Sequence, residues 1–366
     1  MHNLKIPTPG PVVLFGSGET SPSGRRIFDF SLAGIMAPAS RTSPPEIVLL
    51  ETPAGFELNS AQVIGRVEEF LQVHLQNYQP QTTIVPARKR GTYFSPDSHE
   101  ITKPLLRADM IFMGPGSPTY AVRQLEDSLA WHRLIANHRL GATLVLASAA
   151  TVAVSAYSLP VYEIYKVGEE LHWKNGLDIF GPYGFQAIFI PHWNNNDGGK
   201  ELDTSRCFMG KSRFAALLEM LPENIPIIGI DEKTALIMDF AIGQCQVLGL
   251  GGVEVILNPK ESSWSVKVYE SGKSFALNEI GVYQVPLPEV GLPQEVWQEA
   301  LEARSQPLEE PDSHLTAQVS ELVDKREAAR SQEDWKSADD LRDEISKLGW
   351  QVKDTPHGPV LEKSRK

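Results

Sequence analysis

Short apolar runs recur along most of the chain, and each is flanked by glycine, proline or polar residues. Runs of this length are too short for helices and are typical of strands buried on both faces of a sheet. We therefore expect strands at residues 12–15, 47–50, 83–86, 110–113, 143–147, 187–190 and 227–230.

Amphipathic segments lie between several of these runs. One helix face is formed by Val63, Ile64, Val67, Phe70 and Leu71, and residues 120–138 form a second such segment. Strands that alternate with helices indicate a mostly parallel sheet with helices on both sides. The sequence thus predicts an α/β three-layer sandwich.

The pattern changes after residue 241. Residues 245–258 and 263–269 read as short strands with glycine turns, which we expect to extend an edge of the sheet. A proline-rich stretch, a short helix at 294–304 and an acidic break follow. We place one domain at 1–290, a linker with a short helix at 291–313 and a separate segment at 314–366.

The segment from residue 314 onward carries two apolar helical stripes. They are formed by Leu315, Val319, Leu322 and Val323, and by Trp335, Ala338, Leu341, Ile345 and Leu348. Ser331 with Asp334 is a start typical of a capping box, and Gly349 is a typical stop. These patterns predict an α-helical hairpin followed by a short extended end.

Charge and cysteine content exclude several classes of protein. The net charge of −12 argues against a broad nucleic-acid footprint. The two cysteines, Cys207 and Cys245, form no CxxC pair, so we expect no structural zinc site and a reducing compartment. The sequence shows no signal peptide and no apolar stretch of about 18 residues, and we expect a cytoplasmic protein without a membrane span.

Ser148 is the first candidate for chemistry, because it follows the apolar run 143–147 and precedes small residues that open a helix. A serine at the carboxyl end of a strand exposes its hydroxyl, and the next N–H can face a substrate oxyanion. The alternative is an ordinary helix-capping serine.

His192 and Glu232 also follow buried runs and could serve as base and orienting acid. Asp231 is the alternative acid, and His192 could be an ordinary loop histidine.

Glycine-rich turns follow two other runs. Residues 114–120 read GPGSPTY, and we expect Gly116 and Ala149 to be the oxyanion donors, since Pro115 has no N–H. Residues 15–19 read FGSGE, which lacks the third glycine of a dinucleotide-binding fingerprint. We interpret that stretch as a tight turn at the same face of the sheet.

Residues 10–260 resemble the cyanophycinase and aspartyl dipeptidase family of serine peptidases, which has a class I glutamine amidotransferase-like fold. The resemblance is carried by GPGS at 114–117, by 146–150 in place of G-x-S-A-G, by PHW at 191–193 and by GIDEKTAL at 229–236. It implies a triad of Ser148, His192 and Glu232. Leu146, Ala150 and Pro115 stand where the family has glycine.

Residues 326–358 resemble the C-terminal end of cysteinyl-tRNA synthetases, including the DTPHG turn at 354–358. The catalytic and zinc-binding parts of a synthetase are absent from the sequence. From residue 312 to 366 there are ten Lys and Arg against twelve Asp and Glu. We therefore expect that this segment docks to another protein, or is an appendage retained by inheritance alone, before we expect contact with tRNA.

We expect a serine-type hydrolase that cleaves a peptide or isopeptide bond in a peptide or small-molecule substrate, next to an aspartyl residue if the family resemblance extends to specificity. No metal or organic cofactor is implied. One alternative is a non-catalytic member of the same fold that binds a small molecule. The other is a protein associated with RNA or a synthetase through its C-terminal segment. The sequence carries no indication of the oligomeric state.

Overall fold

The computed structural model describes residues 7–38, 41, 43–257, 259, 265–305, 319, 322–323, 325–330, 332, 334–355 and 358–363. The chain forms two compact units, Met1–Ser305 and Gln306–Lys366. Within the described residues, no helix is both long enough and apolar enough to cross a membrane.

An eight-stranded sheet forms the centre of the first unit, in the order β14-β11-β10-β1-β5-β4-β2-β3. The strands from β1 to β3 in this order are parallel, whereas β10, β11 and β14 are antiparallel. Their bounds are β1 Val12–Phe15, β2 Glu46–Leu50, β3 Gln81–Val85, β4 Met110–Met113, β5 Thr143–Ala147, β10 Thr234–Asp239, β11 Gln244–Gly249 and β14 Ser274–Ala276. The predicted α/β class with a mostly parallel sheet is confirmed.

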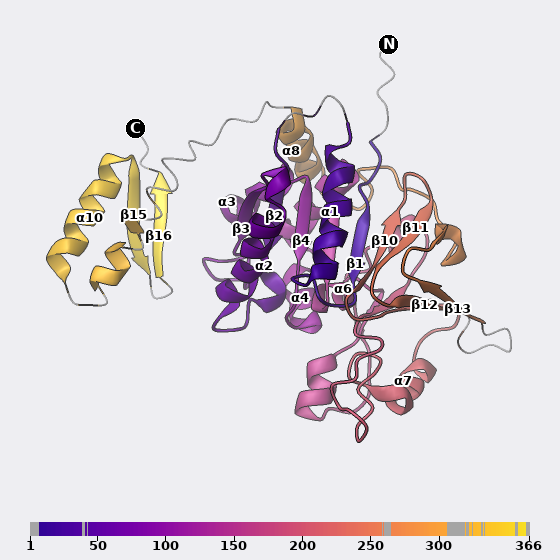
Figure 1. Ribbon diagram of the computed structural model, residues 1–366. Coiled ribbons are helices and arrows are strands. Elements are labelled where there is room, and N and C mark those ends of the chain that lie inside the picture. Colours follow the sequence, from indigo (N-terminus) through magenta and orange to yellow (C-terminus); the bar gives the residue numbers. More distant parts are fainter. Residues whose placement is uncertain are drawn as a thin grey trace, which may run out of the picture. The chain divides into compact units, whose positions relative to one another are not determined.

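Both faces of this sheet are covered, because its strands are apolar on both sides. Val13 and Phe15 pack in a core with α1 and α2, whereas Val12 and Leu14 pack in a second core with α5 and α6. Figure 1 shows α1 and α2 over one face. The helices are α1 Pro22–Met36, α2 Ser60–His74, α3 His99–Thr102, α4 Pro118–Leu125, α5 Leu129–Arg139, α6 Ala149–Ala153, α7 Gly210–Glu219 and α8 Gln294–Ser305, with short 3-10 turns at Thr52–Ala54, Gln76–Tyr78, Lys103–Leu106, Gly181–Tyr183 and Leu277–Glu279.

The apolar segment 120–138 was expected as one helix, but it forms two, α4 and α5. The break lies at Asp127, whose φ of 53° is left-handed, and at Ser128. The Ser128 hydroxyl accepts a hydrogen bond from the Trp131 N–H and begins α5. A local cap thus overrides the continuous apolar pattern.

A second sheet of four strands has the order β13-β12-β9-β8. Its strands are β8 Ile188–Ile190, β9 Ile227–Ile230, β12 Gly252–Leu257 and β13 Ser265–Glu270, and a small pair is formed by β6 Tyr157–Ser158 and β7 Lys174–Asn175. The expected edge extension is therefore only partly correct: β11 extends the main sheet, but β12 pairs with β9. The reason lies in the turn at Gly249, which has a φ of 139° and no room for a Cβ beside the Lys233 carbonyl.

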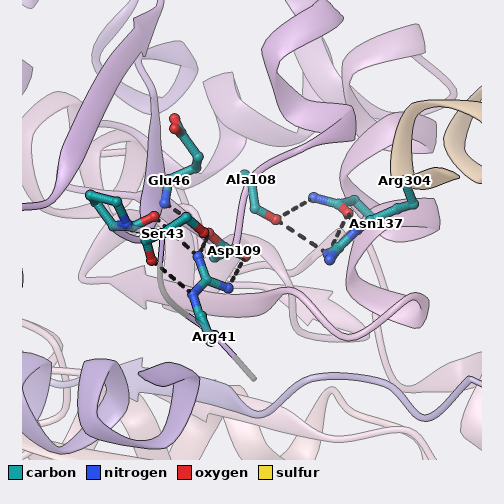
Figure 2. A network of polar contacts seen from close by, with 8 residues as sticks. Arg41, Ser43, Glu46, Ala108, Asp109, Asn137 and Arg304 are labelled. Carbon is teal, nitrogen blue, oxygen red and sulfur yellow. Dashed lines mark hydrogen bonds and ion pairs between the residues drawn. The ribbon is translucent and has the colours of Figure 1, made fainter. Parts of the chain in front are cut away.

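Helix α8 belongs to the first unit and is fixed there by polar contacts (Figure 2). The Arg304 guanidinium donates to Asn137 Oδ1 at 2.9 and 3.1 Å, and Asn137 Nδ2 donates to the Ala108 carbonyl at 2.8 Å. Beside them, Arg41 donates to both carboxylate oxygens of Asp109. These contacts lie at the amino ends of β2 and β4, opposite the strand ends that carry the candidate site.

The second unit contains helical residues 325–330, helix α10 Trp335–Lys347 and a two-stranded hairpin of β15 Trp350–Thr355 and β16 Gly358–Lys363. Asp334 accepts a hydrogen bond from the Ser337 N–H and caps α10, while Ser331 lies outside the described residues. Val319 and Ile345 pack together with Val352. The expected helix pair is thus present, and the expected extended end is the β-hairpin.

Candidate functional site

The three residues expected to act together follow three different strands. Ser148 directly follows β5, His192 lies two residues after β8, and Glu232 lies two residues after β9. The strands β8 and β9 are parallel neighbours in the second sheet. Their carboxyl ends therefore lie at one edge, where the two sheets bring the three side chains together.

The side chains form a continuous chain of hydrogen bonds. Ser148 Oγ lies 2.9 Å from His192 Nε2, and His192 Nδ1 lies 2.8 Å from Glu232 Oε1. Asp231, the alternative acid, instead accepts a hydrogen bond from the Gly252 N–H at 2.9 Å. Glu232 is therefore the acid that contacts the histidine.

Ser148 has a backbone conformation that is rare for a residue with a side chain. Its φ is 52° and its ψ is −109°, and its hydroxyl caps no N–H of α6. Such geometry costs of the order of 1–3 kcal/mol and persists where the surrounding structure enforces it. Since the hydroxyl contacts His192 and not the helix, the alternative of an ordinary capping serine does not account for this residue.

Leu146 and Ala150, which replace two glycines of the family motif, lie in the hydrophobic core and are fully buried. Neither lines the cavity beside Ser148. The strand-to-helix turn therefore forms with both side chains present, and neither of them obstructs the serine.

Two asparagines hold Glu232 in place. Asn195 Nδ2 donates to Glu232 Oε1 at 2.9 Å, and the Glu232 N–H donates to Asn194 Oδ1 at 2.8 Å. The hydrogen bond from His192, with that from Asn195, holds the pKa of Glu232 below its usual value, against the opposing effect of burial. Sequence reasoning missed both asparagines, although they directly follow the HW pair in the chain.

The turn after β1 contacts the backbone of all three strand ends. The Ser148 N–H donates to the Phe15 carbonyl at 3.4 Å and the His192 N–H donates to the Gly16 carbonyl at 3.1 Å. Ser17 Oγ accepts from the Lys233 N–H at 3.3 Å. A Cβ on Gly16 would lie 2.1 Å from the Asp231 carbonyl oxygen. The FGSGE stretch is thus a tight turn at this edge, as expected.

Gly116 and Ala149 lie where the sequence places the oxyanion donors. Both line the same cavity as Ser148. Ala149 is the first residue of α6, so its N–H has no acceptor within the helix. Gly116 has a φ of 144°, and a Cβ there would lie 2.0 Å from the Pro53 carbonyl oxygen. The turn therefore requires glycine at this position.

The cavity beside Ser148 has a volume of about 300 Å³. A second cavity, of about 560 Å³, is lined by Pro11, Gly141 and Thr143 at the amino ends of the strands, on the opposite side from the triad residues. The smaller cavity is the candidate site, because Ser148 and His192 line it. Over the residues that the structure describes, no cluster of three or more histidine, cysteine or acidic side chains could hold a metal ion.

Comparison with solved structures supports the fold of the first unit. A structure titled as a peptidase from an acI-B1 Actinobacterium matches with a TM-score of 0.58 and 22% identity, over 74% of this chain and 98% of that chain. A structure titled as a putative peptidase E protein from Listeria monocytogenes EGD-e also matches, with a TM-score of 0.41 and 13% identity over 72% and 99% of the two chains. The first match shows a shared α/β fold.

The second unit matches by sequence. The family described as the cysteinyl-tRNA ligase anticodon binding domain matches residues 312–358. A cysteine–tRNA ligase from Chlamydia caviae is 44% identical over 52 residues, which is 14% of this chain and 11% of the ligase. A cysteine–tRNA ligase from Finegoldia magna is 40% identical over 55 residues, which is 15% of this chain and 12% of the ligase. The chain thus spans about a tenth of these ligases, and the match lies in its C-terminal segment, as expected.

Proposed function

We propose that this protein is a serine-type hydrolase that cleaves a peptide or isopeptide bond. The observation that carries the proposal is the unbroken hydrogen-bond chain from Ser148 through His192 to Glu232, with the serine in a strained turn. A serine hydroxyl is a weak nucleophile, and an adjacent oriented base activates it.

Ser148 Oγ forms a bond to the scissile carbonyl carbon while its proton passes to His192 Nε2. The carbonyl oxygen becomes an oxyanion that faces the N–H groups of Ala149 and Gly116. The C–N bond then breaks, and His192 gives the proton to the leaving amine. Water, deprotonated by His192, hydrolyses the acyl-enzyme and restores the serine. Glu232 keeps the imidazole in the productive tautomer and stabilises its charged form.

The test compares wild type with Ser148→Ala on a mixture of dipeptides that includes β-aspartyl isopeptides, with mass spectrometry of the products. Wild type is expected to release amino acids from a subset of them. Ser148→Ala is expected to fall to background with an unchanged thermal melt. The exposed serine of α7 provides the control, since Ser212→Ala keeps full turnover. Equal turnover in wild type and Ser148→Ala would overturn the proposal.

A second candidate function is association with tRNA, favoured by the sequence match of residues 312–358. The slight excess of acidic residues in this segment opposes it, because phosphate contacts require clustered positive charge. The full chain and a chain ending at Ser305 are compared for retention of tRNA at increasing salt. Retention by the full chain alone, lost as salt rises, would support this function. Equal weak binding by both chains would argue against it.

A further inference from the structure

The cavity beside Ser148 has one wall formed by aromatic side chains. Tyr162, Tyr165 and Phe208 line it, and we call these three the aromatic wall. The rings of Tyr165 and Phe208 lie 5.4 Å apart between centroids, and the Phe208 ring lies 5.7 Å from that of His192. Val152 and Val161 add apolar surface to the cavity. A group attached to a carbonyl at Ser148 would therefore contact rings and methyl groups.

The segment that carries two of these rings is held against the oxyanion turn. Residues Glu163–Val167 form a π-helical turn, a geometry that is often found at functional sites. Glu163 Oε1 accepts a hydrogen bond from Thr119 Oγ1 at 2.5 Å, three residues after Gly116. The same oxygen lies 3.6 Å from Lys174 Nζ. The segment that carries Tyr162 and Tyr165 is thus held near the turn at which a substrate carbonyl would bind.

The charges around the cavity disfavour an acidic group. Apart from His192, Lys166 is the one basic side chain among the described residues that line it, and Asp197 is the one acidic side chain among them. Lys166 is exposed, and its Nζ lies 5.2 Å from the Tyr165 ring centroid. A carboxylate that enters such a site loses water without gaining a buried cationic partner.

We propose that this hydrolase selects an uncharged, apolar or aromatic group beside the scissile carbonyl, through the aromatic wall, and discriminates against an aspartyl group. This inference rests on the proposed function. It differs from the acidic specificity that the family resemblance implies. The volume of about 300 Å³ is at the low end for small-molecule pockets, which fits one side chain and not a long peptide.

The test uses two diphenyl aminoalkylphosphonates that differ only in carrying a phenylalanine or an aspartate side chain. Ser148 Oγ forms a bond to phosphorus, phenoxide leaves, and the serine proton passes through His192 to the phenoxide. Intact-mass spectrometry of the full chain gives the second-order rate of modification. We expect the phenylalanine analogue to react roughly tenfold faster or more, because ring burial and ring contacts favour it.

Two variants distinguish the contribution of the aromatic wall to the reaction rate from the contribution of Lys166. Tyr162, which is 40% exposed, can be truncated with little effect on the fold, and Tyr162→Ala should slow the phenylalanine analogue roughly tenfold. The same variant is also measured with a small alkyl fluorophosphonate, which carries no ring, and the loss of rate should be larger with the phenylalanine analogue. Lys166→Ala should leave the preference between the two analogues unchanged.

The outcomes that contradict the inference are distinct from those that contradict the function. A faster aspartate analogue, with its rate abolished in Lys166→Ala, would overturn the inferred specificity, while modification at Ser148 would uphold the hydrolase. No modification of Ser148 by either analogue or by the fluorophosphonate would overturn both.

Discussion

Replacing Glu232 by glutamine removes one charge from the hydrogen-bond chain and changes little else in size. In wild type, Glu232 Oε1 accepts from His192 Nδ1 at 2.8 Å and from Asn195 Nδ2 at 2.9 Å. A glutamine side chain offers one oxygen and one NH₂ group. It can present the NH₂ to the imidazole, which favours the tautomer that cannot take the serine proton.

The magnitude follows from the electrostatics of the transition state. The imidazolium and the carboxylate are about 4 Å apart between charge centres, which is worth about 4 kcal/mol at an effective dielectric constant of about 20. The Glu232 side chain is 31% exposed and that of His192 18% exposed, so a lower dielectric constant is not justified. We expect kcat to fall by roughly 10³- to 10⁴-fold, in line with loss of the acid in other triads.

The assay is steady-state turnover of the best dipeptide substrate, with Asp231→Asn as the matched control. Asp231 is the neighbouring carboxylate, and its amide replacement can still accept from the Gly252 N–H. Asp231→Asn is expected to stay within threefold of wild type, roughly. A Glu232→Gln variant that retains wild-type kcat, or an Asp231→Asn variant that loses as much with its fold intact, would refute the assignment of Glu232.

The lowered pKa of Glu232 leads to a prediction about how the stability of the protein changes at low pH. Because the folded pKa is lowered from 4.5, ionised Glu232 contributes stability above that value. This contribution disappears as the pH falls through the lowered folded pKa. Removal of the Asn195 amide by Asn195→Ala should raise the pKa of Glu232, since one hydrogen bond to the charged form is lost. Carboxylate titration of the two proteins by NMR checks the sign, and an unchanged or lower pKa in the variant would contradict it.

Three further predictions concern coupling and stability. His192→Ala added to Ser148→Ala should cost little more than Ser148→Ala alone, because members of a catalytic unit are strongly non-additive, and additive losses in kcat would contradict the unit. Gly229→Ala should lower the free energy of unfolding by about 2–3 kcal/mol, since its Cβ would lie 2.2 Å from the Trp193 ring. Gly34→Ala is the control and should leave the free energy of unfolding unchanged, because there is open space around Gly34. Urea unfolding measures both variants. Burial lowers the pKa of His138 from 6.5 to about 4, so the stability it contributes is fully present above 6.5 and is lost as the pH falls to about 4. That loss should be about 3 kcal/mol relative to His138→Gln, and parallel stability curves for the two proteins would contradict it.

The proximity of Ser148, His192 and Glu232 could be predicted because strand ends are visible in the sequence. Apolar runs mark where β5, β8 and β9 end, and Ser148, His192 and Glu232 each follow one of these strands within two positions. Their meeting at one edge then follows from the general rule for open α/β sheets. That Glu232 and not Asp231 contacts the histidine could not be predicted from the sequence, because adjacent residues after a strand point in different directions.

Other features could not be read from the pattern. The division into two sheets depends on the turn at Gly249, where a φ of 139° that favours glycine redirects the chain, and many glycines in a sequence look alike. One ring of the aromatic wall, that of Tyr165, lies in the π-helical turn 163–167, and Tyr162 directly precedes this turn, which is a rare element without a periodic signal. Asn194 and Asn195 lie in a loop, where polar residues are common and their partners depend on tertiary contacts.

The most direct test of whether Ser148 is the nucleophile is covalent labelling. Wild type and Ser148→Ala are treated with an alkyl fluorophosphonate, digested and mapped by mass spectrometry. We expect a single adduct on Ser148 in wild type, slowed by Glu232→Gln and absent from Ser148→Ala. Unmodified Ser148 in folded wild-type protein, or an equal adduct at another residue in both proteins, would contradict it.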